Sequence, residues 1–564
     1  MKTRNKLYDK SRLRLLCLLT ALLGLFGAGQ TWAGNPTTLT VGGTDVLSGG
    51  YWLTNANGTL TPDGASADNY NVYYDGNGTL TLKDATINGT NIIGHVGAGI
   101  YAEGDLTIVL EGSSTVTGVQ DPNDESQSIR VSGNLTIQGG SLTAQGAETS
   151  SGSSYGIFVT GSFTQQSGIV TAIGGNVSGN YSSEGLYVYG GTVTVERGTL
   201  TATGGNTSGS SYGISARGTV TVGSATVTAT GGSGNASYGL YIDSASPSVT
   251  LSGSGSLTAR SESADRAGGI YVLNLFNSAG SVTVGDNSTL LANSVILYDN
   301  SFEAKPLAPT GNGSWLIYGQ SNQPSAVGGN YTLTDNLTIE SGNTLTIPAG
   351  STLTIPNDKT LTADADQLVV NGELVLEGTF ENAKNLTGSG NLVLGEITLT
   401  DDEGIGAYED YQLKLKSKKV TYVRALSDNS QYGTICLPFV PTSVAGGQVT
   451  YYQVSELESD EITLVETDFE AGKPLFYQTP GTGSITFSAE SAAGVELVTI
   501  PATDSFMEGT MSVATPTAGY FLKNGNIYPI ANGDKVKVKP FRAYVKGQND
   551  ASQASVMSVN VARP

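Results

Sequence analysis

The acidic residues are the first groups in this chain that could do chemistry. A glycoside hydrolase needs two carboxylates that converge on one bond, and a polysaccharide lyase needs acids that hold calcium together with a base. The acids in the repeated part of the chain do not recur in adjacent repeats, and His95 is the single histidine. The sequence therefore predicts no catalytic residue, no metal site and no cofactor. Among these scattered acids are Glu103, Glu184, Glu196 and Asp243.

A column of mostly aromatic residues is the stronger signal. One position recurs every 26 to 30 residues, where neighbouring strands of a sheet would lie about 4.8 Å apart, so the column would span roughly 29 Å. Tyrosine faces stack on the apolar faces of sugar rings, and phenol hydroxyls add hydrogen bonds. We call this column the aromatic strip: Tyr101, Arg130, Phe158, Tyr187, Ser215, Tyr241 and Tyr271. The predicted glycan site consists of Tyr101, Arg130, Phe158, Tyr187, Tyr189, Tyr241 and Tyr271.

The elements that must position this strip are the strands of a seven-fold repeat. A glycine, or Ser128 in its place, opens each copy, and three short alternating strands follow. Repeats of this length indicate the stacked turns of a solenoid. We expect a right-handed parallel β-helix of about seven regular turns. In the fourth copy the side chains expected inside are Leu186, Val188, Val193, Val195, Leu200 and Ala202.

Threonine forms two further outward columns. Stacked threonines are good outward strand formers, so we interpret them as structural. An ice-binding array is the alternative. The second strands contribute Thr107, Thr136, Thr164, Thr194, Thr221, Thr250 and Thr283. The third strands contribute Thr117, Thr143, Thr171, Thr201, Thr228 and Thr258, before Leu291 breaks the column.

The chain as a whole is predicted to be all-β, with five parts. Residues 1–33 are a signal peptide, 34–98 cap the solenoid, and 99–304 form the β-helix. Residues 305–404 carry Leu-Thr-Ile motifs at steps of eight from Leu337, so three steps would close a tighter solenoid turn. A small antiparallel sheet is the alternative there. Residues 405–564 contain short alternating strands that suggest a β-sandwich.

The net charge and the N-terminal segment limit the partners and the location that we expect. The chain has 28 basic and 49 acidic residues and a formal net charge of −21, which disfavours nucleic acid. A basic segment and a short apolar run precede Ala33, as in secretion signals, and no apolar run is long enough to span a bilayer. We expect a secreted or cell-surface protein without membrane insertion.

Two parts of the sequence resemble known exported proteins. The segment leading into Gly97–Ala102 and 105–108 is similar to β-helix proteins of gut and oral Bacteroidetes that are described as carbohydrate-binding. The segments 432–439, 471–474 and 540–544 resemble a terminal module of many secreted Bacteroidetes proteins. The resemblance implies a surface protein that binds carbohydrate.

We therefore expect an adhesin-like surface protein that binds polysaccharide along the aromatic strip. One alternative is a β-helix polysaccharide lyase or glycoside hydrolase, which needs a carboxylate pair. The other is a structural spacer that holds the terminal module away from the cell.

Overall fold

The computed structural model describes residues 34–92, 96–120, 125–262, 267–274, 280–298, 304–319, 325–339, 341–406, 408, 411–426, 432–458, 460–479, 483–531, 534–547 and 556–562. This part is all-β, and its helical segments are two short 3-10 turns, η1 (Ala365–Gln367) and η2 (Ala383–Asn385). Across these ranges, no helix has the length and hydropathy of a membrane span. The chain divides into two units, one reaching to Gly313 and one starting at Ser314.

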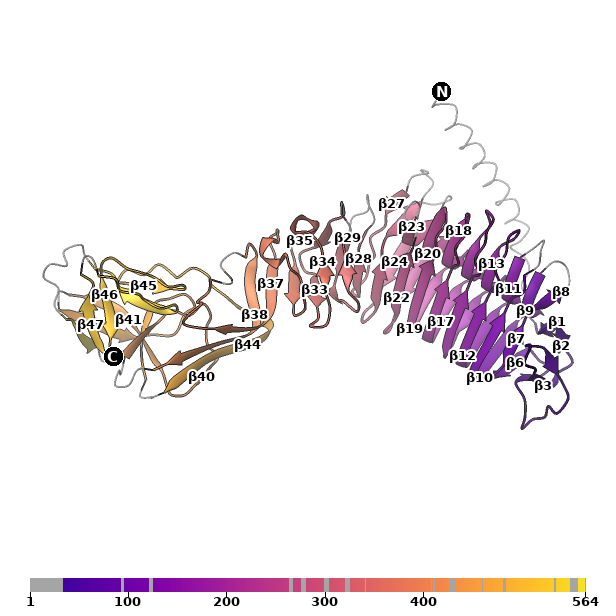
Figure 1. Cartoon of the computed structure of the whole chain (residues 1–564), viewed down its shortest axis with the longest axis horizontal. Helices are drawn as coiled ribbons and strands as arrows, with labels where there is room; N and C mark the ends of the chain where they lie inside the picture. The colour runs from indigo at the N-terminus through magenta and orange to yellow at the C-terminus, as the bar shows by residue number, and fades with distance from the viewer. Residues whose placement is uncertain are drawn as a thin grey trace, which may run out of the picture. The chain divides into compact units, whose positions relative to one another are not determined.

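The first unit is a parallel β-solenoid, and Figure 1 shows its rungs stacked in chain order. The first strands of successive repeats pair in parallel, so Leu186 lies between Ile157 and Ile214. All seven predicted repeats pair in this way, and one strand more follows them. This sheet, sheet A, contains β9 (Val96–Glu103), β11 (Glu125–Val131), β13 (Ser154–Val159), β16 (Ser183–Val188), β18 (Ser210–Ala216), β20 (Ala236–Asp243), β23 (Ala267–Leu273) and β26 (Val295–Tyr298).

The second and third strands of the repeats form sheet B. The second-strand threonines pair as predicted, with Thr194 between Thr164 and Thr221. The third-strand column was misplaced at its start, because Thr143 pairs with Thr115 and not with Thr117. The strands are β10 (Leu106–Thr117), β12 (Leu135–Gln145), β14 (Phe163–Gln165), β15 (Ile169–Ile173), β17 (Val193–Thr203), β19 (Val220–Gly231), β21 (Ser248–Leu251), β22 (Ser256–Ser261), β24 (Ser281–Val284) and β25 (Thr289–Ala292).

Aliphatic side chains fill the axis of the coil. All six residues predicted to point inward from the fourth repeat are fully buried, among them Leu186, Val193 and Leu200. Each layer is closed by the layers above and below it, so burial of β-branched and leucine side chains stabilises the whole stack together. Both outer faces of the coil therefore rest on one shared core.

The opening glycine of each repeat is needed for a close approach inside the coil. A Cβ on Gly185 would lie 2.5 Å from Thr203 N and 2.7 Å from Ala172 O. The pairing between strands also skips this position, going from Glu184 to Leu186. Ser128 occupies the same place in the second repeat, where its hydroxyl donates to Val116 O at 2.7 Å. The Cβ position of this residue is therefore directed into the coil, which interrupts the alternation of the strand.

The N-terminal segment is partly a rung and partly antiparallel. Its strands β6 (Thr79–Lys83) and β7 (Thr86–Asn88) pair in parallel with β10. Strand β1 (Thr38–Val41) pairs antiparallel with β9, and β27 (Ala304–Pro306) pairs antiparallel with β26 at the other end of sheet A. The remaining strands are β2 (Thr44–Asp45), β3 (Gly50–Thr54), β4 (Leu60–Thr61), β5 (Val72–Tyr74) and β8 (Thr90–Ile92).

The second unit begins with the predicted tighter coil. Leu337 pairs in parallel with Leu361, so three steps of eight residues make one turn, and the antiparallel alternative is wrong for these strands. Asn391–Leu399 pairs in parallel with Lys414–Ala425. The parallel ladder therefore continues past the boundary predicted between residues 404 and 405. The strands are β28 (Ser314–Ile317), β29 (Ser325–Gly328), β30 (Asn330–Thr332), β31 (Leu337–Thr338), β32 (Leu345–Ile347), β33 (Thr352–Ile355), β34 (Leu361–Thr362), β35 (Leu368–Val370), β36 (Glu373–Leu376), β37 (Asn391–Leu399) and β38 (Lys414–Ala425).

The C-terminal strands form two sheets around a second core, and their ladders are antiparallel except for the parallel pairing of 461–464 with 558–561. One apolar cluster unites Ile462 and Phe476 of one sheet with Ile527 and Val545 of another. The first sheet contains β39 (Tyr432–Ile435), β41 (Thr450–Leu457), β42 (Glu461–Glu466), β43 (Leu475–Gln478) and β49 (Ser558–Val561). The second contains β45 (Met507–Thr510), β46 (Tyr520–Lys523), β47 (Asn526–Pro529) and β48 (Arg542–Val545). Strands β44 (Ser484–Glu496) and β40 (Ser443–Ala445) extend the ladder of β38.

Candidate functional site

The aromatic strip lies on the outer face of sheet A. Its seven members are partners in successive rungs, as the sequence predicts. The six larger side chains are half-buried, whereas Ser215 is buried. Tyr189, two residues after Tyr187, is 44% exposed. The predicted glycan residues therefore share one face, but their rings are packed against neighbours and do not stand free.

Five tyrosines at one end of this face pack on one another; we call them the tyrosine stack. Tyr212 and Tyr241 have ring centroids 4.8 Å apart with 12° between the planes, and Tyr238 and Tyr271 are 4.5 Å apart at 28°. Tyr271 in turn lies 6.2 Å from Tyr298. Near-parallel rings at these distances cover each other's faces, so the stack presents ring edges more than faces to solvent. The stack consists of Tyr212, Tyr238, Tyr241, Tyr271 and Tyr298.

A second aromatic group precedes the stack. Tyr155 lies parallel to Tyr187 at 5.6 Å, and Phe158 meets Tyr187 edge to face at 5.2 Å. The guanidinium of Arg130 covers Phe158 at 4.9 Å, and that of Arg217 covers Tyr189 at 4.2 Å. Cation–π contacts of this kind stabilise the rings in place and occupy one of their faces.

Sequence reasoning missed four residues of this face. If strict alternation is counted back from Ile157, Tyr155 is expected to point into the coil. Its ring instead packs on that of Tyr187, which points outward. The inward glycine breaks the alternation, so the residue before it points outward in each repeat. The sequence contains a signal for these residues, because an aromatic or acidic residue directly precedes the opening glycine in four repeats. The missed residues are Tyr155, Glu184, Tyr212 and Tyr238.

Glu184 occupies the interval between the two aromatic groups. It lies between Tyr155 and Tyr212 in the sheet and is 4% exposed, with no hydrogen-bond partner for Oε2. Burial raises the pKa of Glu184 to about 8, and repulsion by Glu125 adds to it, while a hydrogen bond with Ser215 opposes the shift. The small Ser215 leaves room for this carboxyl group where other rungs of the strip carry a larger side chain. Glu184 is therefore mainly protonated at neutral pH.

The first rung uses its tyrosine internally. The Tyr101 hydroxyl donates to Glu103 Oε1 at 2.7 Å, and the Thr38 hydroxyl donates to Glu103 Oε2 at 2.9 Å. These bonds hold the pKa of Glu103 below its usual value. Burial, followed by the bond to Glu103, raises the pKa of Tyr101 to about 12. This end of the strip is a closed hydrogen-bonded group.

Three further phenols of this face, those of Tyr187, Tyr212 and Tyr241, are neutral at any physiological pH. Burial raises the pKa of Tyr187, Tyr212 and Tyr241 well above the usual value for a phenol. A neutral hydroxyl both donates and accepts a hydrogen bond, which matches the hydroxyl groups of a sugar. The stack therefore combines rigid ring edges with groups that pair with polyols.

The acids of this face do not form a catalytic pair by any contact described. Glu103, Glu184 and Asp243 share the outer face of sheet A but lie on different rungs, and Glu125 is the acid whose charge adds to the raised pKa of Glu184. Burial raises the pKa of Asp243, and Arg217 opposes this. In the part of the chain that the structure describes, no three His, Cys, Asp or Glu residues gather as metal ligands. His95 lies outside the described residues.

No protein-family model, no curated protein and no solved structure matches the chain.

Proposed function

We propose that the chain binds a polysaccharide along the outer face of sheet A. The observation that carries this proposal is the tyrosine stack, in which large amphipathic side chains are already ordered on a rigid sheet. Ring side chains with few torsions lose little entropy on binding, and their hydroxyls pair with sugar hydroxyls. The packing of the faces favours contact through ring edges and hydroxyls over the face-on stacking expected from the sequence.

A binding test separates these two modes. Affinity electrophoresis of residues 34–564 in gels containing single plant or mucin polysaccharides would compare the parent chain with Tyr241→Phe and Tyr241→Ala. Edge and hydroxyl contact predicts that both variants lose retardation. Face stacking predicts that only the alanine variant does. Thr221→Ala on sheet B is the matched control, and equal retardation of the parent and Tyr241→Ala chains would reject the site.

A glycoside hydrolase is the second candidate, and Glu184 is the observation that favours it. A carboxyl group held protonated at neutral pH is suited to the role of general acid. Release of reducing ends from the polysaccharide that binds, abolished by Glu184→Gln, would support cleavage. We expect the polysaccharide to remain intact after long incubation, which would indicate binding without catalysis.

We also propose a cellular location for the protein, a hand for the coil and an architecture for the C-terminal part. We propose export through residues 1–33 and display at the cell surface, with cleavage before Gly34, which mass measurement of the exported chain would test. Right-handed crossovers between parallel strands are nearly universal, which supports a right-handed coil. The apolar cluster shared by two mainly antiparallel sheets supports a C-terminal β-sandwich. A purely mechanical spacer would bind no polysaccharide in the electrophoresis experiment.

A further inference from the structure

A cationic pocket in the second unit is unexpected in so acidic a chain. The cavity has a volume of about 300 Å³ and lies among β38, β39, β43, β46, β48 and residues 536–539. Four cationic side chains line it, Arg424, Lys537, Lys539 and Arg542, and none of the described residues around it is acidic. Acids outnumber bases by 49 to 28 in the sequence, so this local excess of positive charge runs against the composition.

Arg424 is the buried member of the pocket. It is 8% exposed, its Nη1 donates to Thr434 O, and its guanidinium lies 4.7 Å from the Tyr477 ring centroid. Burial, together with repulsion by Arg542, lowers the pKa of Arg424 to about 10. No carboxylate oxygen of the described residues lies within 4.0 Å of it. The desolvated Arg424 side chain therefore has no carboxylate of the described residues in contact with it.

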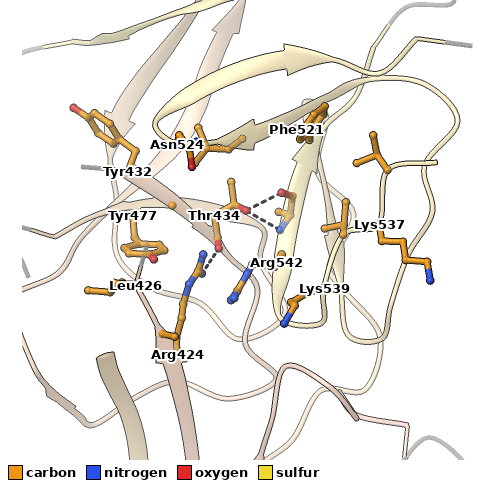
Figure 2. A pocket seen from close by; sticks show the side chains of 16 residues that line it. Arg424, Leu426, Tyr432, Thr434, Tyr477, Phe521, Asn524, Lys537, Lys539 and Arg542 are labelled. Carbon is orange, nitrogen blue, oxygen red and sulfur yellow. Dashed lines mark hydrogen bonds between the residues drawn. The ribbon is translucent and has the colours of Figure 1, made fainter. Parts of the chain in front are cut away.

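The neighbouring arginine, Arg542, is paired with a carboxylate that has no described contact with Arg424. Arg542 Nη2 lies 2.7 Å from Asp401 Oδ2, and its Nη1 donates to the Tyr422 hydroxyl at 2.6 Å. Figure 2 shows the guanidinium groups of Arg424 and Arg542 beside Thr434, whose hydroxyl bonds to the backbone of β48. Since Asp401 already neutralises Arg542, it does not also balance Arg424 by a contact.

The two lysines leave further positive charge at the rim. Lys537 and Lys539 are exposed, and the one ion pair described for either joins Lys539 to the exposed Asp402 at 3.8 Å. Such a pair is weak because water screens it. An anion that entered the pocket would meet a buried guanidinium and two exposed ammonium groups.

We infer that this pocket binds the oxyanion of a small solute, a carboxylate or a sulfate group. A guanidinium presents donors that match such oxygens, and a desolvated cation gains most from a partner that reaches it. The volume lies at the small end of ligand pockets, which limits the occupant to about the size of one sugar. Tyr432, Tyr477 and Phe521 also line the pocket and suit a ring that carries the anionic group.

Calorimetric titration of residues 34–564 tests this inference. We expect glucuronate or inorganic sulfate to bind with a Kd of about 1 mM or tighter, and glucose, the neutral match of glucuronate, not to bind. The tighter of the two anions identifies the source of the oxyanion. Salt should weaken binding, because exposed lysines contribute to it.

The variants compare charges inside and outside the pocket. Lys537→Gln with Lys539→Gln should weaken anion binding about tenfold, whereas Lys535→Gln, which does not line the pocket, should change it less than about twofold. Arg424→Gln should abolish binding, provided that circular dichroism shows the fold intact. Anion binding of undiminished affinity in the double variant, or no binding of either anion to the parent chain, would overturn the inference. Tyr241→Ala should bind anions normally, which separates this pocket from the polysaccharide face.

Discussion

The two outer faces of the first unit differ although one coil builds both. On sheet B the second strands repeat threonine at every rung, with Thr194 flanked by Thr164 and Thr221. On sheet A the same register carries rings, arginines and a buried acid, with Ser215 between Tyr187 and Tyr241. Strand propensity alone explains the uniform face, because threonine suits any outward position. The varied face needs another cause, and we propose that this cause is binding.

Both outer faces should rest on one core, and a substitution in that core tests this with the largest expected effect. Leu186→Ala removes a fully buried side chain that stacks between Ile157 and Ile214. We expect a loss of about 2–5 kcal/mol in the free energy of unfolding. Urea denaturation monitored by circular dichroism measures it. A loss below 1 kcal/mol, small for a buried leucine, would show that the faces do not share this layer.

The varied face should also make stability depend on pH. The pKa of Glu184 is raised, so its contribution to stability is complete at pH values below the unfolded pKa near 4.5, and is lost as pH rises through the folded value of about 8. Glu184→Gln should therefore flatten the decline between these values and stabilise the chain at pH 8, by something on the order of 2 kcal/mol.

Urea midpoints of the parent and Glu184→Gln chains at a series of pH values measure this effect. Glu196→Gln, at an exposed acid of β17, is the control and should leave the slope unchanged. Parallel profiles for the parent and Glu184→Gln chains would mean that this carboxyl group titrates normally.

A matched pair of surface substitutions gives the smallest effect. Tyr241→Ala removes ring contacts to Tyr212, Tyr238 and Tyr271, and should cost about 1–2 kcal/mol. Thr221→Ala on the uniform face should change stability by less than about 0.5 kcal/mol. Thermal unfolding of the two variants compares the faces directly. Equal losses would mean that the ring contacts add nothing beyond ordinary strand packing.

The repeat made much of the fold predictable. Its period placed the rungs, and alternation placed Leu186 inside and Tyr187 outside. Alternation failed for Tyr155, because the glycine after it also faces inward. It failed at Thr117 for another reason: Thr115 and Thr117 both alternate outward, so the pattern does not choose between them.

Other parts of the site depend on contacts that no period encodes. Glu184 forms a hydrogen bond with a serine one rung away, and Asp401 contacts Arg542 rather than Arg424. These relations join residues that are distant in sequence, and the repeat does not determine the identity of the partners. A periodic pattern predicts which face a residue occupies, but not which neighbours it meets there.

Oxidative footprinting of tyrosines with and without a bound polysaccharide tests the binding face most directly. The account predicts that Tyr189, Tyr241 and Tyr271 become protected, while Tyr51 and Tyr73 of the N-terminal segment react as before. Protection of the N-terminal pair, or binding of the polysaccharide with no change at the sheet A tyrosines, would contradict it.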